Sequence, residues 1–129
     1  MSLKDEFNRK KLQKKAKRGF SGYPGATVSF YGPDSNRATK VAVGIIRAEG
    51  AELSALERWV SETTDVRNDP EIVEQLLAFI SMQGAKSVIS PGQIIGCPHE
   101  EGIDYPDGQS CPQCPYWAGR DRFTGHILH

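Results

Sequence analysis

The residues of this chain that are best suited to metal chemistry lie in one short stretch. All three cysteines of the 129 residues occur there, beside a histidine, in the pattern C-x-H-x11-C-x2-C. Zinc in structural sites prefers four tetrahedral sulfur and nitrogen ligands, and three cysteines with one histidine are a common set. The Cys-Pro-Gln-Cys turn can present two sulfurs to one ion. The pattern therefore predicts that a Zn²⁺ ion is bound by Cys97, His99, Cys111 and Cys114.

The spacing of the last two cysteines also matches a redox pair. Cys111 and Cys114 would form this pair, but in thioredoxin-like proteins the motif follows a strand of a βαβ unit, whereas here it follows a loop. Cys97 and His99 would then have no role. Unligated cysteines are a further alternative, and an iron–sulfur cluster is disfavoured because only three cysteines occur. Metal binding is the preferred interpretation.

A catalytic zinc site is the sharper alternative. His99-Glu100-Glu101 followed by Cys-x-x-Cys is similar to the zinc deaminase signature, in which three ligands leave a position for water and a glutamate moves protons. Here residue 110 is serine in place of proline, and Cys97 would occupy the position of the water. We therefore expect a non-catalytic site. The alternative is a zinc-dependent hydrolase or deaminase-like enzyme with Glu100 or Glu101 as general base.

The net charge of the chain is zero, but the charges are unevenly distributed. Basic residues predominate in residues 1–19, and acidic residues predominate after them. Residues 1–19 thus form a basic N-terminal arm, which is compatible with an anionic partner. The mixture of aromatic and basic residues in 116–123 is also compatible with such a partner. For the arm, the alternative is a solvated helix or a disordered tail. For residues 116–123, the alternative is that Trp117 covers the metal site. As an interaction module for RNA or a protein assembly, the chain would use Lys10, Lys11, Lys14, Lys15, Arg18, Trp117, Arg120 and Arg122.

The cellular location is predicted from the absence of apolar segments. No run of about 18 apolar residues occurs, so we expect no membrane span. The first residues lack the apolar stretch of a secretory signal. Clustered cysteines in an odd number fit metal binding in a reducing compartment better than disulfides. The prediction is a cytoplasmic protein, with its oligomeric state left open.

Hydrophobic periodicity predicts the elements that position these residues. Acidic residues four positions before basic ones indicate a helix over 3–18 with a thin apolar face. Apolar residues at helical spacing indicate a helix over 52–62, and a third that begins at Pro70 after Asp69 and is closed by Gly84. Alternation indicates a hairpin of two longer strands, the second of them central because both its faces are apolar. The four expected strands cover residues 26–31, 39–46, 86–90 and 93–96.

This order of elements predicts an α/β fold. We expect a small, mainly antiparallel sheet with two packed helices, 52–62 and the helix from Pro70, and a C-terminal zinc-knuckle segment. The expected organisation is a basic N-terminal arm over 1–19 and a single α/β domain over 20–129. Residues 93–124 form the zinc-binding segment of that domain.

Three strings of the chain resemble a conserved family of small bacterial proteins of unknown function. They are GYPGATVSFYGPD at 22–34, DVRNDP at 65–70 and IIGCPHEEGIDYPDGQSCPQCPYW at 94–117. The resemblance spans most of residues 20–124 and leaves out the basic arm. It implies a small cytoplasmic α/β domain that ends in a zinc-binding segment, and it implies no catalytic residues.

Overall fold

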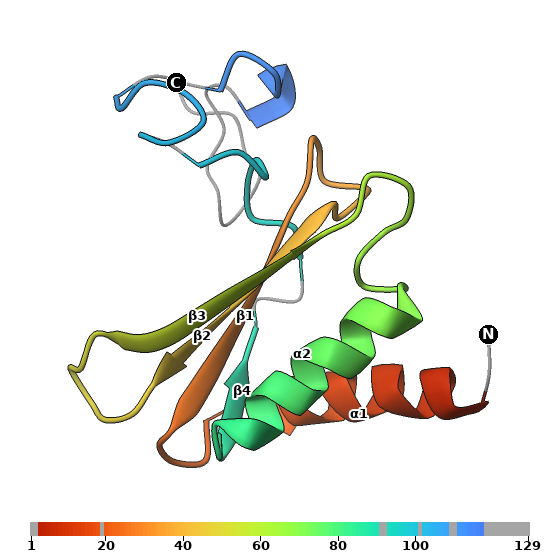
Figure 1. Cartoon of the computed structure of the whole chain (residues 1–129), viewed down its shortest axis with the longest axis vertical. Helices are drawn as coiled ribbons and strands as arrows, with labels where there is room; N and C mark the ends of the chain where they lie inside the picture. The colour runs from red at the N-terminus through yellow and green to blue at the C-terminus, as the bar shows by residue number, and fades with distance from the viewer. Residues whose placement is uncertain (1–2, 19, 91–92, 101, 109–110, 118–129) are drawn as a thin grey trace.

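The computed structural model describes residues 3–18, 20–90, 93–100, 102–108 and 111–117. Within this part the chain forms two α-helices, a four-stranded sheet and a short 3₁₀ helix (Figure 1). The elements are α1 (Leu3–Arg18), β1 (Gly25–Tyr31), β2 (Lys40–Ile46), β3 (Leu53–Val60), α2 (Pro70–Met82), β4 (Ser87–Ile89) and the 3₁₀ helix (Pro115–Trp117).

The sheet is mixed, and its strand order is β3-β2-β1-β4. β1 and β2 pair antiparallel, as do β2 and β3, whereas the short β4 runs parallel to β1. The predicted hairpin of β1 and β2 is confirmed, and β2 lies between two neighbours as expected. The α/β class with a mainly antiparallel sheet and two packed helices is therefore confirmed, although one of the two helices is not the one predicted.

The hydrophobic core lies between the sheet and the two helices, which pack side by side in Figure 1. Alternate residues of β1 and β2 face this core, because successive side chains of a strand point to opposite faces. Each fully buried aliphatic side chain contributes about 1.5–3 kcal/mol. The buried core side chains include Ala26, Val28, Phe30, Val41, Val43, Ile45, Leu76 and Ile80.

Local signals mark both ends of α2. The Asp69 side chain accepts hydrogen bonds from the backbone N–H groups of Glu71 and Ile72, at 3.1 and 3.2 Å. Pro70 follows in the first turn, where it has no hydrogen bond to lose. Gly84 follows the last turn with a φ of 68°, which glycine adopts without steric cost. The helix predicted from Pro70 is confirmed.

The helix predicted over residues 52–62 is wrong, because most of this segment forms β3. Leu53, Leu56 and Trp59 have helical spacing, but β2 offers a full antiparallel ladder that this segment completes. In the strand, Trp59 turns toward α2, where its Nε1–H donates to Gln75 Oε1 at 3.0 Å. The tertiary partner therefore outweighs the local pattern.

The second packed helix is α1. The prediction of a helix over 3–18 is confirmed, and Leu12 is buried in the core with Ala16 packed beside it. The remaining strand predictions have different outcomes. The segment 86–90 contains β4, whereas the strand predicted over 93–96 is reduced to an isolated bridge between Ile94 and Phe30. The division into an arm over 1–19 and a domain over 20–129 stays a prediction.

No helix in the described part of the chain is both long enough and apolar enough to cross a bilayer.

The loop before α2 is held by an ion pair. Asp65 accepts hydrogen bonds from the Ala38 N–H at 3.1 Å and from Arg67 Nη2 at 2.6 Å. Burial opposes ionisation of Asp65, but the hydrogen bonds from Arg67 and from backbone N–H groups outweigh it and lower the pKa of Asp65. Val66, between the two partners, is fully buried. The DVRNDP string is thus explained by loop and helix geometry.

We expect Asp65→Asn to lower the free energy of unfolding by about 1.5–3 kcal/mol at neutral pH, because it removes hydrogen bonds to a charged group. The folded-state pKa lies below the ordinary value, so the contribution of Asp65 is present above about pH 4 and is lost as the pH falls through the folded pKa. Urea unfolding at neutral and acidic pH measures both effects. Glu49→Gln, at an exposed position, is the control, and an equal loss in the two variants would contradict this role.

Candidate metal centre

Four side chains from two separate stretches converge at one end of the molecule. The sulfurs of Cys97, Cys111 and Cys114 and a ring nitrogen of His99 all lie within 4.8 Å of one another. His99 Nδ1 is 3.2, 3.4 and 3.5 Å from the three sulfurs in that order. The four predicted ligands therefore lie close enough together to hold a metal ion.

The first pair of donors is carried by an extension of the sheet. Beyond the bridge at Ile94, the Ile95 N–H donates to Phe30 O at 3.0 Å, and the Gly32 N–H donates to Gly96 O at 2.8 Å. The corner that follows is tight, because the His99 N–H donates to Cys97 Sγ at 3.2 Å. The end of β1 thus determines where this corner lies.

The second pair is carried by a turn and the 3₁₀ helix. The Cys114 N–H donates to Cys111 O at 3.4 Å, and the Trp117 N–H donates to Cys114 O at 3.2 Å. Both cysteines are buried, at 8 % and 3 % exposure. This compact turn allows both sulfurs to face His99.

Trp117 holds the second pair of donors, Cys111 and Cys114, against the same end of β1. Its Nε1–H donates to Gly32 O at 2.7 Å, and the neighbouring Tyr116 hydroxyl donates to Ser35 Oγ at 3.0 Å. Gly32 is suited to this position because a Cβ atom there would lie 1.9 Å from Arg37 O. Trp117 therefore packs between the cysteine turn and the α/β body, as in the interpretation of an aromatic cover.

Burial disfavours charge on the sulfurs. Burial raises the pKa of the Cys97 thiol, and the neighbouring cysteines Cys111 and Cys114 raise it further. Burial also raises the pKa of the Cys114 thiol. Thiolates bind metals, so a cation at this position would supply the positive charge that favours their deprotonation.

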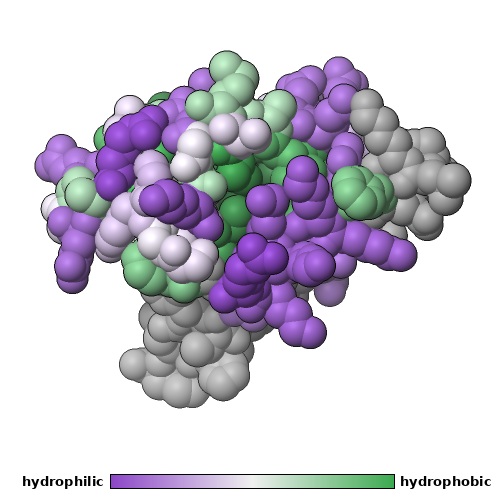
Figure 2. All heavy atoms as spheres, turned by 90° about the horizontal axis from the view of Figure 1, so that it is seen from below, coloured by the Kyte–Doolittle hydropathy of each residue, from purple (hydrophilic) through white to green (hydrophobic). Residues whose placement is uncertain are grey.

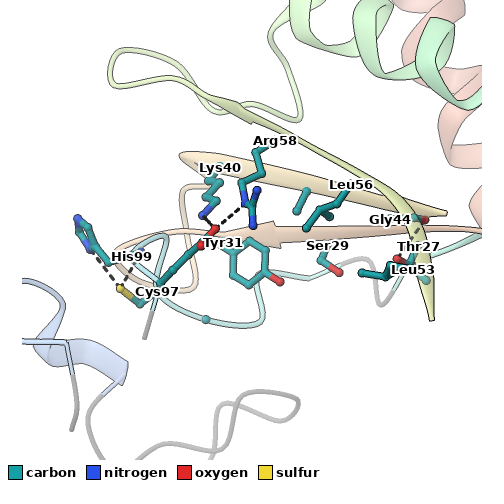
Figure 3. Close-up of a pocket in the computed structure, with 13 residues that line it drawn as sticks. Thr27, Ser29, Tyr31, Lys40, Gly44, Leu53, Leu56, Arg58, Cys97 and His99 are labelled. Atoms are coloured by element: carbon teal, nitrogen blue, oxygen red, sulfur yellow. Dashed lines mark hydrogen bonds and ion pairs between the residues drawn. The ribbon is translucent and has the colours of Figure 1, made fainter. Parts of the chain in front are cut away.

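A buried lysine joins the first corner to the sheet (Figure 3). Lys40, whose side chain is 10 % exposed, donates from Nζ to Pro98 O at 3.0 Å and to Glu100 Oε1 at 2.9 Å. Arg58 on β3 pairs with the same Glu100 oxygen at 2.5 Å. Sequence reasoning missed Lys40 and Arg58. The only signal was a lysine at the start of an otherwise apolar strand.

The position of Glu100 bears on the enzyme alternative. The hydrogen bond from Lys40 and the charges of Lys40 and Arg58 lower the pKa of Glu100, which makes its carboxylate a weaker base. Its backbone N–H donates to Asp104 Oδ2 at 2.7 Å. Glu100 is thus used to hold the corner, and Glu101 lies outside the described residues.

The metal centre borders a hollow on the sheet face opposite the helices. The hollow has a volume of about 430 Å³, and its floor includes the small residues Ala42 and Gly44. Cys97 and His99 form one wall, and Figure 3 shows Tyr31 and Ser29 along the same side of the sheet. The metal segment therefore contributes to the shape of this face.

The predicted RNA-contacting residues are not brought together. Lys15 is half-buried and the other described basic residues of this set are exposed on α1, which lies at the opposite end of the molecule from the 3₁₀ helix that carries Trp117 (Figure 1). Arg120 and Arg122 lie outside the described residues. The described parts of the two segments thus belong to separate surfaces.

Comparisons of the chain with protein-family models, curated protein sequences and solved structures give no match. The resemblance to small bacterial proteins therefore stays a prediction. The role of the metal centre has to be argued from its own geometry.

We expect Lys40→Met to weaken metal binding about tenfold, because residues that support the ligand segment outside the coordination sphere commonly contribute this much. Methionine keeps the buried stem and removes the bonds to Pro98 and Glu100. Competition with a chromophoric chelator measures the affinity. Arg47→Met, which removes a guanidinium paired with Gln83, is the matched control. Equal affinities for the two variants would show that Lys40 does not support the site.

Proposed function

We propose that this protein is a non-catalytic zinc-binding protein that acts as an interaction module for RNA. The observation that carries the zinc assignment is the convergence of three sulfurs and one imidazole nitrogen within 4.8 Å. Zn–S bonds of about 2.3 Å and Zn–N bonds of about 2.0–2.1 Å at tetrahedral angles place nitrogen about 3.6 Å from each sulfur. The observed 3.2–3.5 Å is close to that spacing.

The donor set supports zinc over other metals. Three soft sulfurs and one imidazole suit zinc, whereas calcium and magnesium take oxygen ligands. A four-iron cluster takes four thiolates, and the chain has three cysteines. Four protein ligands also complete a tetrahedral shell, which is typical of a structural site.

The ion would hold a segment that has little core of its own. Among the described residues from 97 to 117, only Cys111 and Cys114 are buried, and Ile103 is 75 % exposed. Hydrophobic burial therefore contributes little here, and coordination would supply the ordering free energy. The same ion would keep Trp117 and Glu100 against the α/β body.

We expect the purified protein to contain one zinc ion per chain, and chelation to disorder residues 97–100 and 111–117 while the sheet and helices remain folded. The core between sheet and helices is built from other residues, so it does not depend on the ion. Elemental analysis measures the metal, and amide spectra recorded before and after chelation report on the two regions. Cys111→Ser should reproduce the effect of chelation, whereas Ser35→Ala should retain the metal.

X-ray absorption at the zinc edge tests the non-catalytic assignment. Three sulfur ligands and one nitrogen, with no oxygen, are expected. A bound water would support the hydrolase alternative. Metal-free protein with an equally ordered segment and freely modifiable thiols would contradict the zinc proposal.

The RNA role is supported by the charge on α1. Lys10, Lys11 and Lys14 extend into solvent from a helix that is anchored to the core by Leu12. Lysine and arginine that neutralise phosphates release counterions, which makes nucleic-acid affinity depend on salt. An anchored basic helix can therefore present these charges without the ordering cost of a disordered tail.

We expect the protein to bind a fluorescein-labelled oligouridylate of about ten nucleotides, a length within the range of single-strand sites. Affinity should fall steeply between about 50 and about 200 mM KCl, because the release of counterions from the RNA contributes less to binding as the salt concentration rises. Fluorescence anisotropy measures both. Absence of binding at the lower salt, or binding without a salt dependence, would contradict the RNA role.

A further inference from the structure

Basic side chains from two distant parts of the sequence converge at the end of α1. Lys15 and Arg18 of α1 line a small hollow together with Lys86, which precedes β4. Of the side chains that line it within the described residues, none is acidic; the others belong to Ser21, Ala85 and Val88. The three cations therefore form a local positive surface, although the whole chain has no net charge.

Hydrogen bonds hold the segment after α1 against Lys86. The Lys86 N–H donates to Pro24 O at 2.7 Å, and the Ser21 hydroxyl donates to Lys86 O at 3.0 Å. The Ser21 N–H donates to Ser87 Oγ at 2.7 Å, and the Ser87 hydroxyl donates to Gly22 O at 2.6 Å. The chain on both sides of the hollow is thus fixed before any partner binds.

The segment that is hydrogen-bonded to Lys86 and Ser87 also carries an exposed aromatic ring, that of Phe20. Phe20 is 57 % exposed, and its ring meets Tyr23 edge-on, with centroids 5.0 Å apart and planes 67° apart. An edge-on partner leaves ring surface free for stacking. Exposed aromatic rings beside a basic surface are typical of sites that bind single-stranded nucleic acids.

We propose that Lys15, Arg18, Phe20 and Lys86, here called the Lys86 patch, bind a single-stranded RNA segment. The cations contact successive phosphates, and a base stacks on Phe20. This inference rests on the proposed RNA function and names its binding surface. Figure 2, which looks at the molecule from below, shows hydrophilic side chains on both sides of a central stretch of hydrophobic ones.

RNA fits this surface better than an anionic membrane. A helix that lies in a membrane interface needs an apolar face to enter the bilayer. Leu12 of α1 is buried in the core, and among the described side chains of α1 Phe7 is the exposed large apolar one. A basic hollow next to a segment with one exposed ring matches phosphate contacts with base stacking.

Exposed cations outside the hollow provide a matched control for the charge. Lys15 and Arg18 line the hollow with Lys86, whereas three other cations are exposed and do not line it. These control residues, which are not among the predicted RNA-contacting residues, are Lys17, Arg37 and Arg47.

The experiment compares two triple variants of the full-length, metal-loaded protein by fluorescence anisotropy with the same oligouridylate. Lys15→Gln/Arg18→Gln/Lys86→Gln should bind about tenfold or more weakly, and its salt slope should fall by about 2, because each lost phosphate contact on a single strand removes about 0.7. Lys17→Gln/Arg37→Gln/Arg47→Gln should lose less than about threefold. Thermal unfolding confirms that both variants are folded.

Phe20→Leu separates stacking from charge. It should weaken binding about fivefold or more with an unchanged salt slope, because base stacking on an aromatic ring does not release counterions. Oligothymidylate of equal length should show the same dependence on the patch.

Different failures have different meanings. Equal losses in the two triple variants would overturn the Lys86 patch while leaving the RNA function in place. Absence of RNA binding by the unmodified protein, with or without binding to vesicles of phosphatidylcholine and phosphatidylserine, would overturn both the patch and the RNA function.

Discussion

The end of the β1–β2 hairpin is the point on which the C-terminal segment depends. Gly32 donates to Gly96 and accepts from Trp117, so one residue connects both cysteine-bearing stretches to the body. Lys40, the first residue of β2, adds two bonds to the stretch that contains Pro98 and Glu100. The donors can converge because these short backbone and side-chain contacts place both stretches at the same edge of the sheet.

The two faces of the sheet have different roles in the structure. One face is filled by aliphatic side chains packed against α1 and α2, which provide a core independent of any metal. On the opposite face, small residues leave a hollow, and the Cys97–His99 corner forms its wall. Lys40 is buried on this second face without harm because Pro98 and Glu100 satisfy its charge, whereas a buried cation without partners would be costly.

The cluster of basic side chains and the metal centre are also kept apart. The cations of α1 and Lys86 gather at one end, and the metal centre lies at the other (Figure 1). Glu100 is paired with Lys40 and Arg58, so it is held as a structural anion and is poorly suited to accept a proton from water. The proposed structural ion at one end and the proposed RNA-binding patch at the other are therefore compatible in a small chain.

The sequence by itself determined what depends on neighbouring residues. Alternation in β1 and β2, the Asp69-Pro70 start of α2 and the spacing of the four donors are local signals, and the structure agrees with each. Tertiary structure alone decided that residues 53–60 form β3, because their pattern suits a helix until β2 offers a ladder. It also decided that Lys40 meets Glu100 and that Lys86 meets Lys15, since long-range contacts leave no trace in local spacing.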